Sequence, residues 1–182
     1  FFVHYFHNAM FPILAHWLSR GELSIGPFYG NQIPLNDAAL YGGKLFWPLG
    51  PLPALFFLPI IGLIEHLPLS YFQAGFVTML NVLNCWLLVQ LGRKLGLTLQ
   101  QALWVSFAFL FASPYIGVAY FSLNSYVSHV VTTTWLLGSL DEFFGKRRYW
   151  LIGILMGFAL VTRVTAGVGI MFYFLSIVFD QI

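Results

Sequence analysis

From residue 71 onward, hydrophobic residues form five long, nearly uninterrupted runs with polar residues between them. The runs cover approximately residues 71–91, 101–121, 126–140, 149–162 and 164–179. Because the runs are continuous rather than alternating, they predict apolar α-helices and not half-exposed strands. Pro114 lies inside the second run and predicts a kink there, because proline lacks the N–H that a helix interior needs.

An earlier apolar run, residues 51–66, is interrupted by Pro51, Pro53 and Pro59. Its sixteen residues would rise about 24 Å as a helix, which is short of the ~30 Å hydrocarbon core of a bilayer. The run either spans the membrane or only dips into its surface and returns. Its length and its prolines favour the second interpretation.

The N-terminal part of the chain is mixed in character. Residues 8–23 carry apolar side chains at helical spacing with polar ones between them, which predicts an amphipathic helix at a membrane interface, with Gly21 as its stop. Residues 24–47 are rich in Gly, Pro, Asn and aromatic residues. This composition predicts an ordered loop.

The composition of the chain indicates that these helices belong to a membrane protein. The chain of 182 residues is 59% hydrophobic, 19% aromatic and only 8% charged, with a mean hydropathy of +0.82. A soluble domain carries about 25% charged residues. We therefore expect an all-α fold, a polytopic transmembrane helical bundle, and a piece of a longer membrane protein. The net charge of +2 is too small to indicate a nucleic-acid partner.

The basic residues predict the orientation of this bundle. Five of the eight Lys and Arg residues lie in two short loops between apolar runs. They are Arg93, Lys94, Lys146, Arg147 and Arg148. The positive-inside rule makes that side cytoplasmic. Residues 1–70 then form an external, periplasmic region with juxtamembrane helices, and residues 71–182 form the transmembrane helices of a multi-pass inner-membrane protein.

Two groups in the N-terminal region suggest catalysis. Asp37 could act as a general base or hold a metal, or it could simply complete a turn with Asn36. His4 and His7 are spaced to share a helix face and could shuttle a proton or bind a metal. They could equally be interfacial histidines. We commit to no metal, because no carboxylate lies near them in the sequence.

Three further residues are candidates for ligand binding, and two of them suggest a ligand with a phosphate group. Lys44 and Arg163 lie outside the basic loops, and a cation at membrane depth is costly unless it has a partner. Either could bind a phosphate, although Lys44 could instead extend to the interface and Arg163 could be structural. His129 follows small polar residues that could line a cavity with it or form hydrogen bonds between helices.

The order of motifs along the chain resembles a known family. The motifs are LSRG at 18–21, Asp37, YGGK at 41–44, WPLGPLPA at 47–54 and GFALVTR at 157–163. They are similar to the first external loop and a later helix of bacterial polyprenyl-phosphate-dependent glycosyltransferases of the GT-C superfamily. That family includes relatives of protein O-mannosyltransferases and of the lipid A aminoarabinose transferase. The resemblance covers nearly the whole chain.

The resemblance implies an inverting hexosyltransferase-type reaction on the external face of the membrane. A base deprotonates an acceptor hydroxyl, which attacks the anomeric carbon of a sugar carried on a polyprenyl phosphate. In the family an acidic residue precedes the first amphipathic helix, where this chain reads HYFHNAM without an acid. Either His7 substitutes, or Asp37 serves, or the acid lies upstream of Phe1.

The resemblance also implies the binding site and the partners. Substrate-binding candidates are Tyr41, Lys44, Trp47, His129 and Arg163. Of these, Lys44 and Arg163 would stabilise the leaving phosphate. The partners are a lipid-linked sugar donor, membrane lipid and an unidentified acceptor, with no cofactor and with a divalent metal optional in the family.

Two alternative functions stay open. One is a transporter or lipid-carrier flippase without transferase activity, although no internal repeat is visible. The other is a structural subunit of a membrane complex.

Overall fold

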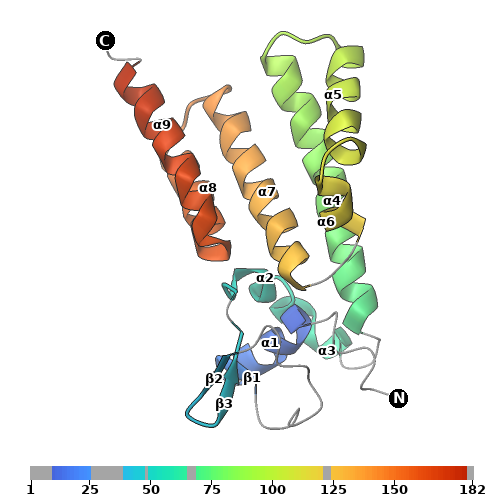
Figure 1. Ribbon diagram of the computed structural model, residues 1–182, viewed down its shortest axis with the longest axis vertical. Helices are drawn as coiled ribbons and strands as arrows, with labels where there is room; N and C mark the ends of the chain where they lie inside the picture. The colour runs from blue at the N-terminus through green and yellow to red at the C-terminus, as the bar shows by residue number, and fades with distance from the viewer. Residues whose placement is uncertain (1–9, 26–38, 48, 65–68, 121–123, 180–182) are drawn as a thin grey trace.

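A computed structural model of the chain describes residues 10–25, 39–47, 49–64, 69–120 and 124–179, and Figure 1 shows it as a ribbon. Long helices stand side by side, and a layer of short helices and strands lies across one end of them. The expectation of a mainly helical fold is confirmed, and a small sheet adds to it.

The long helices follow the hydrophobic runs. They are α4 (Leu69–Lys94), α5 (Leu99–Phe111), α7 (Asn124–Phe143), α8 (Tyr149–Thr162) and α9 (Val168–Phe179), with the short α6 (Tyr115–Tyr120) and a 3₁₀ turn, η5 (Val164–Gly167). In the described part of the chain, α4 alone is long and apolar enough to cross a membrane, over Phe72–Lys94. The helical runs are therefore confirmed, and a bundle that spans the membrane several times stays a prediction.

Pro114 breaks its run rather than kinking it. The helix α5 ends before it and α6 begins directly after it. The Ser113 hydroxyl accepts a hydrogen bond from the Tyr115 N–H at 3.1 Å, and so takes the place of a helical carbonyl. At its other end, α5 begins with a capping box in which Thr98 and Gln101 satisfy each other's backbone N–H groups.

The N-terminal layer contains α1 (Met10–Leu18), three strands, α2 (Leu52–Leu55), η4 (Leu58–Ile60) and α3 (Ile61–Ile64). The helix α1 lies inside the predicted 8–23 segment, and Gly21 follows its end with a φ of +78°, which glycine adopts without strain. The consecutive residues from Phe11 to Ala15 are all buried. Since one exposed face is what an interfacial helix needs, α1 is more enclosed than we expected.

A three-stranded antiparallel sheet replaces part of the predicted loop. It has the order β1 (Ser24–Ile25), β3 (Lys44–Phe46), β2 (Ala39–Tyr41). The strands β2 and β3 form a hairpin whose two turn residues, Gly42 and Gly43, have φ of +56° and +75°. A two-residue hairpin turn needs positive φ at such positions, so glycines are favoured there. The loop prediction is therefore wrong for these described residues.

The proline-rich run 51–66 does not form one helix in its described part. It consists of α2, η4 and α3 in succession, and none of them exceeds four residues. This agrees with the expectation that the run would not make a continuous helix of spanning length. Its buried residues Ala54 and Phe57 pack into a core that α1, α4 and α7 share.

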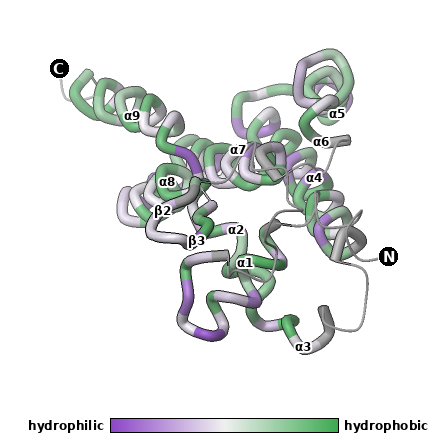
Figure 2. Tube along the Cα trace, turned by 60° about the horizontal axis from the view of Figure 1, so that its bottom comes forward, coloured by the Kyte–Doolittle hydropathy of each residue, from purple (hydrophilic) through white to green (hydrophobic). Residues whose placement is uncertain are grey.

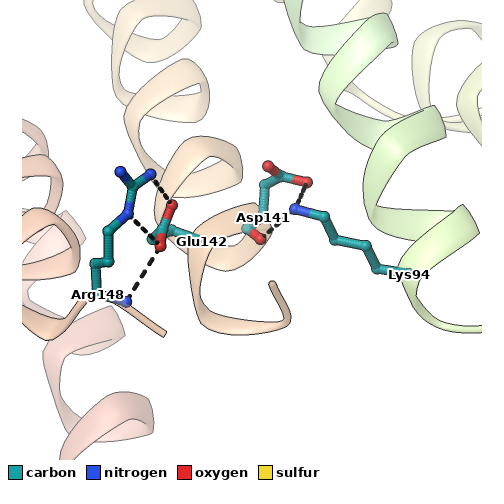
Figure 3. Close-up of polar contacts among 4 residues, drawn as sticks. All are labelled: Lys94, Asp141, Glu142 and Arg148. Carbon is teal, nitrogen blue, oxygen red and sulfur yellow. Dashed lines mark hydrogen bonds and ion pairs between the residues drawn. The ribbon is translucent and has the colours of Figure 1, made fainter. Parts of the chain in front are cut away.

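Both basic loops lie at the end of the helices opposite the N-terminal layer (Figure 1). Two ion pairs hold this end together, as Figure 3 shows. The Lys94 ammonium at the end of α4 lies 2.7 Å from Asp141 of α7. The Arg148 guanidinium, just before α8, donates to both carboxylate oxygens of Glu142. The two loops therefore lie at the same end of the helices, and their location on the cytoplasmic side of a membrane stays a prediction.

Candidate functional site

The two apolar runs at the C-terminal end of the chain, 149–162 and 164–179, meet at a break in the helix next to the N-terminal layer. The helix α8 ends at Thr162, and Arg163 has an extended backbone with a φ of −149° before η5 begins. The interruption places a half-buried arginine at the end of the bundle, between two helices that are otherwise apolar.

Arg163 meets the start of α7 at this interruption. Its Nη1 donates a hydrogen bond to the Ser128 hydroxyl at 3.3 Å, and Ser128 is fully buried. His129 follows Ser128 on α7, and the Arg163 charge is close enough to act on it electrostatically. We call Ser128, His129 and Arg163 the junction site. Two of the predicted binding residues, His129 and Arg163, are thus brought together.

The described part of the motif WPLGPLPA, residues 47 and 49–54, lies on the end of α8. A Cβ atom added to Gly50 would lie 1.8 Å from the Val161 carbonyl oxygen, so only glycine allows this approach. The helix α2, which follows in the same motif, contacts both α7 and α8. The described residues of this motif therefore pack beside the junction site.

Trp47 lies in the same layer and is half-buried. Its ring packs edge-on against Phe11, with 6.4 Å between the ring centroids, and it belongs to the periphery of the shared core. Its indole N–H is buried and has no hydrogen-bond acceptor within the described residues. Trp47 therefore acts mainly through the packing of its ring, and its indole N–H could donate a hydrogen bond to a polar ligand.

Tyr41 and Lys44 lie elsewhere. They face each other across the last pair of the β2–β3 hairpin, and both side chains are exposed, that of Tyr41 to 80%. No described contact connects them to the junction site. The structure therefore divides the five predicted binding residues among the junction site, the core and the hairpin tip.

The two catalytic candidates, Asp37 and His7, lie outside the described residues, as does His4. Within the described ranges, no cluster of three or more His, Cys, Asp or Glu side chains is arranged to hold a metal ion. Asp37 and His7 therefore stay predictions from the sequence as the base of the reaction.

Sequence reasoning missed the role of Gly50. The signal was present, because a glycine between two prolines in an apolar stretch often marks a close backbone approach. Ser128 is one of several small polar residues that precede His129 in the sequence. Its selection as the partner of Arg163 depends on how α7 and α8 pack against each other, and no local pattern contains that information.

Comparison of the chain with protein-family models, with curated proteins and with solved structures gave no match. The resemblance to GT-C glycosyltransferases therefore depends on the motifs quoted above and on the residues of the site.

Proposed function

We propose that this chain belongs to the membrane domain of a glycosyltransferase that moves a sugar from a polyprenyl phosphate to an acceptor. The main support for the proposal is the position of Arg163, which lies at the break between α8 and η5 and donates a hydrogen bond to the buried Ser128. The segment around Gly50 packs on the end of α8 beside it. A guanidinium can bind two phosphate oxygens at once, which suits a lipid phosphate at the membrane surface.

The outer surface of the helices supports a membrane location. Large apolar side chains are exposed on several helices, among them Trp86 on α4, Trp104 on α5 and Phe174 on α9. Figure 2 shows hydrophobic residues along most of α9. A soluble protein rarely exposes such continuous apolar surface, and lipid would cover it here.

The charge distribution supports an external junction site. The basic loops lie at the opposite end of the helices, and cytoplasmic loops are enriched in Lys and Arg. The junction site and the N-terminal layer then face the periplasm, where a lipid-linked donor would present its sugar.

The proposed step is a single displacement. The acceptor oxygen attacks the anomeric carbon and loses its proton to a base, for which Asp37 and His7 are the candidates. The bond between the anomeric carbon and the phosphate oxygen breaks, and its electron pair remains on the phosphate. Negative charge therefore grows on the leaving group as the bond breaks, and Arg163 stabilises that charge. Inversion follows from attack opposite the leaving group.

The test uses the full protein in membrane vesicles with polyprenyl-phosphate hexoses as donors. Wild-type protein is expected to convert donor into glycosylated product, and Arg163→Ala is expected to make product at least about a hundredfold more slowly. Lys146→Gln, which removes an exposed cation at the opposite end, should match wild type. Wild-type vesicles without product, or equal rates in wild type and Arg163→Ala, would refute the proposal.

A flippase is the second candidate, because interrupted helices also occur in transporters. The break before η5 and the break at Pro114 both divide apolar runs, and such breaks form binding sites in transporter bundles. The same vesicles distinguish the two functions. A flippase would move the lipid-linked sugar across the bilayer and leave its glycosidic bond intact.

A further inference from the structure

The β2–β3 hairpin presents an aromatic ring to water at a distance from the bundle. Tyr41, at the end of β2, is 80% exposed. The hairpin lies at the side of the N-terminal layer that faces away from the long helices (Figure 1). Lipid around those helices would therefore leave the Tyr41 ring uncovered. Tyrosine is enriched at binding surfaces, because its ring is rigid and both apolar and polar in character.

Three side chains share one face of this hairpin. Tyr41 and Lys44 are paired across the two strands, and Phe46 lies two positions after Lys44 on β3. Paired residues, and residues two positions apart in one strand, lie on the same face. The Tyr41 and Phe46 rings are in edge contact there, with 6.4 Å between their centroids. Phe46 thus orients the Tyr41 ring on the face that also carries Lys44.

The hairpin holds this face with little freedom. A turn of only two glycines, Gly42 and Gly43, joins its strands, and both have the positive φ that such a turn needs. On its other side, β3 is also paired with β1. A ring and a cation that are already fixed beside each other lose little conformational entropy when a ligand binds.

The pair of groups indicates the chemistry of the ligand. The face of an aromatic ring carries partial negative charge, so it attracts the weakly positive C–H groups on the flat side of a sugar ring. Lys44 is exposed, and within the described ranges its ammonium group has no carboxylate partner. An ammonium group of this kind pairs with an anionic group of a ligand. A sugar that carries a carboxylate satisfies both residues at once.

We propose that Tyr41 and Lys44 bind an acceptor oligosaccharide that contains uronic acid units, with a sugar ring on the tyrosine and a carboxylate on the lysine. The inference rests on the proposed function for the existence of an acceptor. One unit of the oligosaccharide is held at the hairpin, and another reaches the junction site, where the donor binds. An acidic peptide would use the lysine but has no flat sugar face for the tyrosine.

The test is a titration, followed by saturation-transfer NMR, of the full detergent-purified protein with tetragalacturonate or with the neutral maltotetraose. Wild type should bind tetragalacturonate more tightly. Tyr41→Ala should weaken the binding of both sugars about fivefold, whereas Tyr41→Phe keeps the ring and should bind both as wild type does. Lys44→Gln should weaken only tetragalacturonate, by about two- to fivefold. Lys146→Gln, at the opposite end of the molecule, is the control for charge and should match wild type.

Four results would overturn the proposal. They are no saturable binding of tetragalacturonate by wild type, unchanged binding in Tyr41→Ala, the same loss in Lys146→Gln as in Lys44→Gln, and equal affinity for tetraglutamate. The last would show that charge alone is recognised. No donor is present in this titration. Saccharide binding without product in the vesicle assay would count against the proposed function, and product without saccharide binding would count against this inference alone.

Discussion

At the scale of single residues, the junction site depends on one hydrogen bond, and its two partners differ in how well the sequence predicts them. Arg163 was recognisable in the sequence, because an arginine between two apolar runs needs a partner. Its partner Ser128 is 35 positions away, and only the packing of α7 on α8 selects it. The exposure of Tyr41 and Lys44 was equally unpredictable, since the resemblance located them in a loop and not at the tip of a hairpin.

Gly50 provides a prediction at this scale. Gly50→Ala would push a methyl group into the Val161 carbonyl, which is backbone and cannot turn away. We expect a loss of about 1–3 kcal/mol, seen as a lower apparent Tm of the detergent-purified protein. Gly62→Ala is the matched control, because no atom lies within 4 Å of the added carbon. An unchanged Tm in Gly50→Ala would contradict the close packing of the WPLGPLPA loop on α8.

At the scale of elements, helices were predictable and strands were not. The run 149–162 matches α8 residue for residue, because a continuous apolar run leaves little doubt about a helix. The strands of the sheet are two or three residues long, which is too short for an alternating pattern to appear. The Gly-Gly pair was the one local signal of the hairpin.

The link between α7 and α8 gives a pH-dependent prediction. Glu142 lies beyond the predicted membrane segment 126–140, and its hydrogen bonds from the Arg148 side chain lower its pKa from 4.5 to about 2, with the Lys94 charge acting in the same direction. The pair therefore adds stability that is complete above pH 4.5 and disappears as the pH falls toward 2. Wild type should lose apparent Tm across this window.

The variant comparison isolates this effect from other titrating groups. Glu142→Gln should have a lower Tm than wild type at pH 7, and the two should converge as the pH approaches 2. Glu22→Gln, at an exposed position in the N-terminal layer, should follow wild type throughout. A constant difference between Glu142→Gln and wild type at all pH values would contradict the ion pair.

At the scale of the whole molecule, the orientation of the bundle can be tested directly. In a Cys85→Ala background, Tyr41→Cys and Lys146→Cys place single exposed thiols at opposite ends. A membrane-impermeant maleimide should label Tyr41→Cys in intact spheroplasts and Lys146→Cys only after the membrane is permeabilised. Labelling of both positions from the same side, or in the reverse order, would show that the topology is wrong.

The central claim is that Arg163 stabilises a leaving phosphate, and steady-state kinetics of sugar transfer by the full protein test it most directly. Because the charge grows only as the bond breaks, Arg163→Ala should lower kcat at least about a hundredfold and raise KM for the donor much less. Arg163→Lys should recover part of kcat by restoring the charge. A kcat in Arg163→Ala equal to that of wild type would contradict the account.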